Sequence, residues 1–334
     1  MKKVILFRVD GGKVWGISTG HIRRSLILAN VLSSKYKIIF VMKNYPDGVD
    51  FVKNRGINVE LIDINDDSDA SLINLCAKYS PEKIIFDLYS NPYTDLLEYA
   101  HARQIQTIVF DILGKCAGCP DILINDSFVG DFTKYPHLIN KTRLYLGTKY
   151  FIIAKPIKII PIRHKVKDVM ITMGGSDPAG LTLKIMRSVL KDSMDFTAHI
   201  ILGPSFTGHK EVYDIVKSRR NIKVHKNPLN FLKLLSLQDV VITAAGRTLY
   251  ECAYLGKPVI IVPSIDHEIV VSAEYAKLTG SFYVGHWDDV ISPAKIIKAL
   301  DYYKNNYSKR EPIFKSSRNL VDGSGLKRIL AIIN

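Results

Sequence analysis

A histidine that follows a glycine-rich loop is the residue of this sequence best placed for acid–base chemistry. The first apolar run ends at Asp10, and the segment Trp15–His21 then contains Gly16, Gly20 and His21. Glycines let a backbone approach a ligand closely, and the free N–H groups at a helix start favour an anion. Because that positive helix end disfavours imidazolium, we expect a neutral His21 that accepts a proton. The alternative is a plain connection in which His21 only caps a helix.

A second glycine-rich turn lies in the other half of the chain. Within Met170–Pro178, an apolar run leads into Gly174, Gly175, Ser176 and Asp177, and a helical pattern follows. This order of strand, small residues and helix is typical of a phosphate cradle made of backbone N–H groups. In the simpler interpretation, Asp177 caps the helix and the proline after it takes the first helical position. Both interpretations can hold together.

The segment Thr243–Glu251 repeats the arrangement of a strand, a small-residue turn and a helix. Gly246, Arg247 and Thr248 can offer N–H groups and a cation to a diphosphate. Glu251 follows one turn later and can accept hydrogen bonds from ribose hydroxyls. The alternative for Glu251 is a capping-box partner of Thr248.

Polar side chains follow two apolar runs in the first half of the chain. Asp87 and Tyr89 follow one of these runs, and Asp111 follows the next. Because ligands bind outside the carboxyl ends of parallel strands, we expect Asp87 and Tyr89 at the edge of a binding cleft. For Asp111 we favour solvation of a loop.

The charge balance points to anionic partners. The 334 residues carry a formal net charge of +14, which suits phosphate-bearing small molecules, nucleic acid or an anionic membrane surface. The basic residues are scattered, and we find no zinc finger, RNA-recognition signature or basic helix. We therefore expect no nucleic-acid partner, and an anionic membrane is a candidate for peripheral association. The sequence does not indicate the oligomeric state.

Cysteine use and hydropathy indicate a cytoplasmic protein. Cys116 and Cys119 have the spacing of a zinc or redox motif, but no second pair of ligands has matching spacing, so we favour reduced thiols in a loop and expect no metal or cofactor. No apolar run reaches the roughly 18 residues of a membrane span. Arg8 and Asp10 interrupt the N-terminal apolar run too early for a signal peptide.

Short apolar runs alternate with helical patterns along most of the chain, which predicts parallel sheets with helices on both faces. We expect strands at 4–9, 37–42, 59–62, 83–87, 107–110, 122–124, 168–172, 197–202, 222–225, 240–243, 259–262 and 282–284. We expect helices at 21–33, 49–55, 68–79, 93–104, 181–190, 211–217, 229–237, 248–255, 269–278, 292–305 and 325–333.

The predicted fold is α/β with two doubly wound, Rossmann-like domains that face a cleft. Residues 1–152 form the first domain, and residues 153–166, with Pro156 and Pro161, form a linker. Residues 167–334 form the second domain, whose last helix is a candidate to pack back toward the first.

These segments together resemble a known family, the UDP-sugar hydrolase of pseudaminic acid biosynthesis and the related spore-coat polysaccharide proteins, with the glycosyltransferase-B fold. The matching stretches, in order along nearly the whole chain, are 7–10, 20–26, 87–89, 174–177, 246–251 and 322–329. The resemblance implies UDP bound mainly to the C-terminal domain, with the sugar facing the N-terminal one. It implies inverting attack of water at the anomeric carbon, with no metal required. His21 would activate the water, and Tyr89 would position sugar or water.

The residue patterns and the resemblance together give the predicted site residues. The catalytic set is His21, Tyr89 and Asp87. The set that binds substrate and UDP is Asp10, Gly20, Arg24, Gly174, Gly175, Ser176, Asp177, Gly246, Arg247, Thr248, Glu251 and Glu268.

Three departures from the family pattern concern the substrate more than the fold. The loop before His21 is about two residues longer than in the family. Leu88 stands where the family usually has histidine, and Glu268 stands where glutamine is usual. An additional anion near a diphosphate is unfavourable unless Arg247 or a sugar hydroxyl pairs with it. The identity of the sugar depends on the loops 13–19 and 113–122, whose shape the spacing does not fix.

The leading hypothesis is therefore an enzyme, a UDP-sugar hydrolase acting on an acetamido-deoxy sugar in surface-glycan or nonulosonic acid biosynthesis. The alternative is a glycosyltransferase of the same fold that moves the sugar to a hydroxyl or lipid-linked acceptor, with the basic charge holding it at a membrane. A third hypothesis is a non-catalytic sugar-nucleotide sensor or a nucleic-acid-binding protein.

Overall fold

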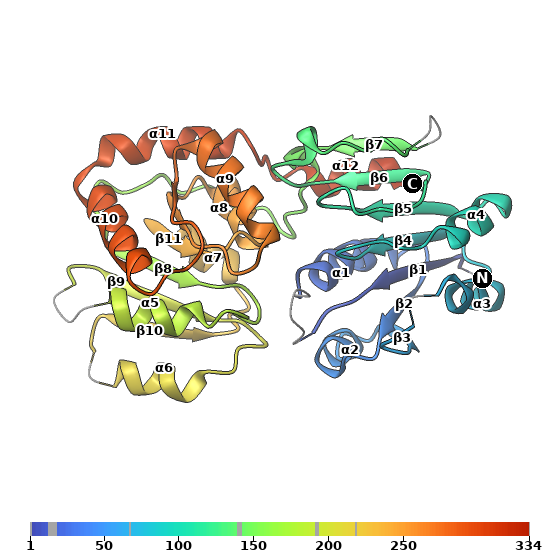
Figure 1. Cartoon of the computed structure of the whole chain (residues 1–334), viewed down its shortest axis with the longest axis horizontal. Coiled ribbons are helices and arrows are strands. Elements are labelled where there is room, and N and C mark those ends of the chain that lie inside the picture. Colours follow the sequence, from blue (N-terminus) through green and yellow to red (C-terminus); the bar gives the residue numbers. More distant parts are fainter. Residues whose placement is uncertain are drawn as a thin grey trace. The chain divides into compact units, whose positions relative to one another are not determined.

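The computed structural model describes residues 2–12, 19–66, 68–138, 142–190, 194–217 and 219–333. The chain divides into two compact units (Figure 1). Unit 1 comprises Met1–Ala154 and Ser324–Asn334, and unit 2 comprises Lys155–Gly323. The chain therefore leaves unit 1, forms unit 2 and returns to unit 1 for its last helix.

Unit 1 is built on a parallel sheet in the strand order β3-β2-β1-β4-β5-β6-β7. In that order the strands are β3 (Asn58–Ile62), β2 (Lys37–Lys43), β1 (Val4–Val9), β4 (Lys83–Asp87), β5 (Gln106–Phe110), β6 (Ile122–Asn125) and β7 (Arg143–Leu146). Its helices are α1 (Gly20–Leu32), α2 (Pro46–Lys53), α3 (Asp69–Tyr79), α4 (Asp95–Ala102), α12 (Gly325–Ile333) and the short turns η1 (Gly130–Phe132) and η2 (Thr148–Tyr150). The order changes direction between β1 and β4, which is where such sheets bind ligands.

Alternate residues of β1 face two different hydrophobic cores of unit 1. Phe7 lies in the core that also receives Ile22 of α1 and Ile329 of α12. Leu6 lies in the core that receives Leu72 of α3 and Leu96 of α4. Because helices cover both faces, the central strands β1 and β4 are buried along almost their whole length, as the sequence pattern predicted.

Unit 2 has a second parallel sheet, in the order β10-β9-β8-β11-β12-β13. In that order the strands are β10 (Ile222–Lys226), β9 (Thr197–Leu202), β8 (Asp168–Thr172), β11 (Val240–Thr243), β12 (Val259–Ile261) and β13 (Phe282–Tyr283). Its helices are α5 (Leu181–Val189), α6 (His209–Val216), α7 (Phe231–Ser236), α8 (Arg247–Leu255), α9 (His267–Thr279), α10 (Ile291–Asn305) and α11 (Tyr307–Arg318).

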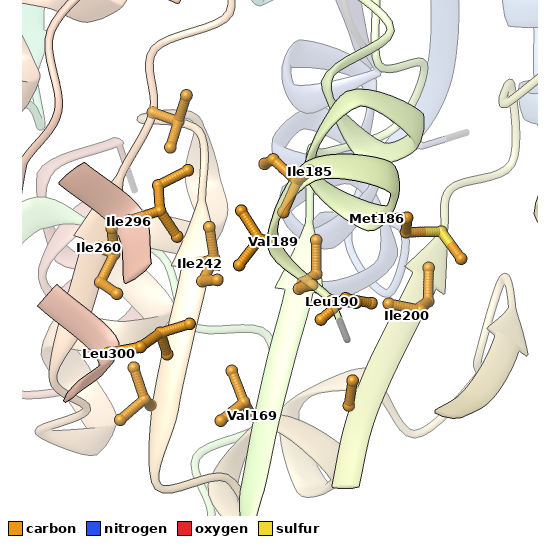
Figure 2. Close-up of a cluster of buried hydrophobic side chains, with 14 of the residues drawn as sticks. Val169, Ile185, Met186, Val189, Leu190, Ile200, Ile242, Ile260, Ile296 and Leu300 are labelled. Atoms are coloured by element: carbon orange, nitrogen blue, oxygen red, sulfur yellow. The ribbon is translucent and has the colours of Figure 1, made fainter. Parts of the chain in front are cut away.

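Aliphatic side chains from α5 and α10 pack on one face of the unit 2 sheet (Figure 2). Ile185 and Val189 of α5 and Ile296 of α10 share this core with Val169 of β8 and Ile260 of β12. Burying a side chain of this size contributes about 1.5–3 kcal/mol. This core fixes the strand ends from which the predicted phosphate-binding turns begin.

The predicted fold class is confirmed, since both sheets are parallel and carry flanking helices. Besides the short turns η1 and η2, the sequence did not predict strand β7 and helix α11. Strand β7 is a partly exposed edge strand, and α11 is polar and contains Pro312, so neither gives a clear apolar pattern.

The segment predicted to be a linker, 153–166, lies almost wholly in unit 2. Its backbone is held there, because the hydroxyl of Tyr254 bonds to both the N–H and the carbonyl of Ile157. Arg163 pairs with Asp168 and Asp239. Helix α12, counted in the second domain but named as a candidate to pack back toward the first, contributes Ile329 and Ile333 to a core of unit 1.

Among the helices that the structure describes, none combines the length and the apolar character needed to cross a membrane.

Candidate functional site

His21 and Asp87 form a hydrogen-bonded pair in unit 1. His21 is the second residue of α1, and Asp87 is the last residue of β4. The Nδ1 atom of His21 lies 2.6 Å from Oδ1 of Asp87, with the histidine side chain 12% exposed and the aspartate fully buried. A carboxylate at Nδ1 selects the tautomer that carries its proton there, and it leaves Nε2 as the nitrogen that can accept a proton.

Asp87 is held in place by Arg24, one helical turn beyond His21. Two nitrogens of Arg24 donate to the two oxygens of Asp87 at 2.8 and 2.6 Å, and a third donates to Asp126 at 2.8 Å. Burial acts to raise the pKa of Asp87, but the charge and hydrogen bonds of Arg24, with a smaller contribution from His21, hold that pKa well below its usual value. Asp87 is therefore an ionised acceptor beneath His21.

This arrangement changes two of the predicted roles. Asp87 was expected at the edge of a cleft, but it is fully buried and acts through His21. Arg24 was expected to contact substrate, but only 4% of it is exposed, and its guanidinium lies 4.4 Å over the ring of Phe110. Because all of its directed hydrogen bonds go to carboxylates inside unit 1, Arg24 is a positioning residue.

Asp10 also differs from its predicted role as a substrate ligand. Both of its oxygens accept hydrogen bonds from Arg8 at 2.7 Å, and Oδ1 also accepts from the backbone of Lys43 at 2.8 Å. Arg8 donates in addition to the hydroxyl of Tyr93 at 3.0 Å. The Asp10 carboxylate, 7% exposed, is fully used in joining the ends of β1 and β2.

Tyr89 follows β4 and receives a hydrogen bond from the ammonium group of Lys115. That ammonium also lies 3.8 Å from the centre of the Tyr89 ring. Asp111 accepts hydrogen bonds from the backbone N–H groups of Gly114 and Lys115 at 2.6 and 2.8 Å. It also accepts one from the hydroxyl of Tyr135 at 2.7 Å. The expectation that Asp111 only solvates a loop was wrong, because it is 3% exposed and anchors the loop that carries Lys115.

The turn after β8 in unit 2 presents small residues at the carboxyl end of the sheet. Gly174 has a φ of +78°, a conformation that favours glycine. A Cβ on Gly203 would lie 2.4 Å from the carbonyl oxygens of Gly174 and Gly175, so the turn packs directly against the strand end of β9. Ser176 lies in the same turn and is partly exposed.

Asp177 binds the first amides of α5, but it is not the N-cap residue that the simpler interpretation proposed, because that residue is Gly180. The Asp177 oxygens accept hydrogen bonds from the backbone of Leu181 and Thr182 at 2.8 and 2.9 Å. The helix begins at Leu181 rather than at Pro178. Burial raises the pKa of Asp177 above its usual value, and the amides of Thr182 and Leu181 oppose that shift. Its carboxylate is directed to the helix.

The turn after β11 leads into α8, which starts at Arg247 with Gly246 as its N-cap. Thr248 therefore lies inside the helix and is not its N-cap, which removes the capping-box interpretation of Glu251. Arg247, Thr248 and Glu251 occupy the first two turns of α8 and are partly exposed. They remain candidates for nucleotide contacts.

Glu268, in the first turn of α9, points to the start of α8. A Cβ on Gly246 would lie 3.5 Å from its Oε1 atom, and its Oε2 atom accepts the backbone N–H and the hydroxyl of Ser264 at 2.8 and 2.9 Å. Burial raises the pKa of Glu268, and backbone amides that include Ser264 and Ala245 oppose the shift. An acidic group thus already lies where a diphosphate was predicted.

The structure therefore gathers the predicted residues into separate groups. His21, Gly20, Asp87 and Arg24 meet in unit 1 at the start of α1, whereas Tyr89 belongs to a neighbouring group with Lys115. The residues predicted to bind UDP lie in unit 2, at the turns after β8 and β11. Most of the glycine-rich loop before His21, residues 13–18, lies outside the described residues.

Two residues of these groups were missed from the sequence. Asp126 follows β6 in the run 125–127, and this polar cluster after an apolar strand was the available signal. Lys115 lies in the loop 113–122, which was predicted only to shape the pocket. Leu88, noted as a departure, is buried and lies in a core of unit 1.

Among the described residues, no three or more histidine, cysteine or acidic side chains are grouped so that they could hold a metal ion. Cys116 and Cys119 are both free thiols, the first buried and the second exposed. Burial raises the pKa of Cys116 to about 12, which keeps it a protonated, unreactive thiol at neutral pH.

A comparison with known protein families identifies the family of the chain. Residues 144–317 match a family described as a protein of unknown function (DUF354). The chain belongs to this family.

Three curated relatives extend the comparison. An uncharacterised protein of Methanocaldococcus jannaschii is 31% identical over 275 residues, which is 76% of this chain and 54% of that protein. The spore coat polysaccharide biosynthesis protein SpsG of Bacillus subtilis is 22% identical over 75% of each chain. A Helicobacter pylori protein, named as a pseudaminic acid cytidylyltransferase and UDP-2,4-diacetamido-2,4,6-trideoxy-beta-L-altropyranose hydrolase, is 32% identical over 147 residues, 43% of this chain and 26% of that protein. The chain thus spans about half of the Methanocaldococcus protein and about a quarter of the Helicobacter protein.

Solved structures share the fold over the whole chain. MurG of Acinetobacter baumannii superposes with a TM-score of 0.67 at 11% identity, covering 99% of each chain. The spinosyn rhamnosyltransferase SpnG, complexed with thymidine diphosphate, gives a TM-score of 0.66 at 12% identity, covering 98% of this chain and 100% of that one. The chain therefore has the glycosyltransferase-B fold.

Proposed function

We propose that this chain is an enzyme that hydrolyses a nucleotide sugar, releasing UDP from a UDP-linked acetamido-deoxy sugar. The observation that carries the proposal is the His21–Asp87 pair at the carboxyl end of the unit 1 sheet, with 2.6 Å between Nδ1 and the carboxylate. The name of the Helicobacter relative includes a UDP-sugar hydrolase activity, and its match to this chain supports the choice of substrate class. A role in surface-glycan or nonulosonic acid biosynthesis follows from that relative and from SpsG.

In the proposed reaction, Nε2 of His21 takes a proton from a water molecule. The oxygen of that water attacks the anomeric carbon as the bond from that carbon to the phosphate oxygen breaks. UDP leaves with the electron pair, and the configuration at the anomeric carbon inverts. The imidazolium that forms is stabilised by the carboxylate of Asp87 at Nδ1. Such general-base catalysis contributes about 10²–10⁴-fold to a rate.

The proposal assigns the nucleotide to unit 2. There, Gly174, Gly175 and Ser176 after β8, and Gly246, Arg247 and Thr248 at the start of α8, would contact the diphosphate. Backbone N–H groups at such turns bind phosphate without a side-chain charge. Glu251, one turn further along α8, would bind the ribose hydroxyls.

The test is release of UDP from a panel of UDP-sugars in the absence of any acceptor, with product NMR on the best substrate. We expect His21→Asn to lower kcat by about 10²–10⁴-fold, with the affinity for UDP unchanged. Full activity of the His21→Asn variant contradicts the assignment of His21.

A glycosyltransferase is the second candidate, favoured by the likeness in fold to solved transferases such as SpnG. The same histidine would then deprotonate an acceptor hydroxyl. Release of UDP that is slow without acceptor, and is accelerated many-fold by a hydroxyl or lipid-linked acceptor, identifies the transferase.

A further inference from the structure

Lys115 differs from Arg8 and Arg24, two other cations of unit 1, in what it faces. Arg8 pairs with Asp10, and Arg24 pairs with Asp87 and Asp126. The ammonium of Lys115 instead contacts the hydroxyl and ring of Tyr89, a neutral side chain. Among the residues that the structure describes, it has no ion pair with a carboxylate.

Hydrogen bonds hold the backbone of Lys115 at both its N–H group and its carbonyl group. Its N–H donates to Asp111 at 2.8 Å, and its carbonyl accepts the N–H of Asn91 at 3.2 Å and the hydroxyl of Ser90 at 3.4 Å. Asp111 is itself held by Tyr135. A flexible lysine normally loses side-chain entropy when it binds an anion, and a fixed backbone with ring packing reduces that loss.

The position of this cation relates it to the proposed chemistry. Lys115 contacts Tyr89, which is two residues beyond Asp87 on the same strand end, and Asp87 bonds to His21. A half-buried ammonium without a carboxylate ion pair among the described residues can attract an oxyanion that binds beside it.

From this geometry we infer that Lys115, held against Tyr89, recognises an oxyanion of the substrate and so determines substrate specificity. The inference rests on the proposed function. A UDP-sugar carries oxyanions on both of its phosphates and, in a uronic acid, on a carboxylate of the sugar ring. Because the proposed function assigns the diphosphate to unit 2, we assign Lys115 to the sugar carboxylate. Tyr89 keeps the ammonium aimed at that group.

Binding of three compounds distinguishes these sources. We compare UDP, UDP-glucose and UDP-glucuronic acid by calorimetry with the full-length wild type, Lys115→Met and Lys115→Arg. If Lys115 binds a sugar carboxylate, the wild type prefers UDP-glucuronic acid, and Lys115→Met removes that preference without weakening UDP-glucose. If Lys115→Met instead weakens all three by the same factor, the cation acts on the diphosphate and the assignment to a sugar carboxylate is overturned. The loss of one charge-assisted hydrogen bond corresponds to about tenfold to hundredfold in Kd.

Two controls separate recognition from a general effect of charge or fold. Lys134 is exposed in the same unit, so Lys134→Met removes an equal charge and is expected to leave all three affinities unchanged. Lys115→Arg keeps the charge and should recover most of the lost affinity. Equal affinities of Lys115→Met and the wild type for every compound overturn the inference.

The same set of proteins separates this inference from the proposed hydrolysis. Binding that depends on Lys115, with no release of UDP by the wild type, supports the inference and contradicts hydrolysis. Release of UDP that Lys115→Met leaves unchanged, with unchanged affinities, supports hydrolysis and contradicts the inference. A wild type that binds none of the three compounds overturns both.

Discussion

A buried carboxylate next to a histidine can serve structure alone, so the surroundings of Asp87 matter more than the contact itself. Asp87 receives two hydrogen bonds from Arg24, one from Ser25 and one from His21. A carboxylate needed only to neutralise Arg24 would not require the histidine, because Asp126 already pairs with that arginine. The arrangement is that of an acceptor kept ionised so that it can orient an imidazole.

Asp87→Asn tests this orienting role. The amide keeps the shape of the side chain but can present a donor to Nδ1 of His21, which favours the wrong tautomer. We expect kcat for UDP release to fall by about 10²–10⁴-fold, with the affinity for UDP unchanged, because UDP is assigned to unit 2. The measurement is kcat against pH together with UDP binding by calorimetry.

Ser25→Ala is the matched control for Asp87→Asn. It removes a longer hydrogen bond to the same carboxylate, 3.3 Å from Ser25 Oγ to Asp87 Oδ2, and leaves Arg24 and His21 in contact with it. We expect its kcat to lie within about threefold of the wild type, since a single neutral hydrogen bond contributes little. Equal effects of Asp87→Asn and Ser25→Ala would show that Asp87 has no special role.

Sequence patterns at this scale identify residue types but not their partners. The position of His21 after a glycine-rich segment, and of Asp87 at a strand end, predicted that both belong to a site. The bond between Arg24 and Asp126 joins residues 102 positions apart, and no local pattern reveals it. Burial of Asp10 and Arg24 likewise depends on packing between strands and helices, so their predicted contacts with substrate could not be checked from spacing.

At the scale of elements, apolar runs predicted the strands well because both sheets are buried on two faces. Strands β1, β4, β8, β9 and β11 have the predicted bounds. The helix starts were less predictable, since they depend on caps. Helix α5 begins at the predicted Leu181, where Asp177 binds its first amides. By contrast, α9 begins at His267, two residues before the predicted start, and α8 begins one residue earlier than predicted.

The junction of α8 and β12 contains a buried lysine whose titration affects stability. Lys257 is 2% exposed, and its ammonium donates to the carbonyl of Ser236, at the end of α7, at 2.6 Å. Burial lowers the pKa of Lys257 from 10.5 to about 8, against a smaller opposing effect of Asp239. The folded chain therefore releases this proton at a lower pH than the unfolded chain.

This difference predicts a gain in stability with rising pH. Between pH 8 and 10.5 the unfolded state binds more protons at Lys257 than the folded state, so the free energy of unfolding rises across that window. At about 1.4 kcal/mol for each pKa unit, the contribution grows by about 2 kcal/mol from pH 7 to pH 9.5. We expect urea denaturation to show this rise in the wild type but not in Lys257→Met. Parallel pH dependences of the two proteins contradict the assignment to Lys257.

At the scale of the whole molecule, the chain does not form its two units one after the other, because both of its ends belong to unit 1. The last helix, α12, belongs to unit 1, and a Cβ on Gly325 would lie 2.1 Å from the carbonyl oxygen of Phe151. The sequence shows that α12 is amphipathic but not which core it joins. The same limit applies to residues 155–166, which have the composition of a linker and yet pack on unit 2.

Because α12 packs in unit 1, we expect that weakening its packing destabilises unit 1 and leaves unit 2 unaffected. Ile329 is fully buried with residues of β1 and α1, so Ile329→Ala should cost about 2–5 kcal/mol. Hydrogen exchange should then show faster opening of β1 and β6, with β8 and β11 unchanged and UDP still bound. Ile332→Ala, at a partly buried position of the same helix, should have a smaller effect. An equal loss of protection in β8 would show that the two units unfold together.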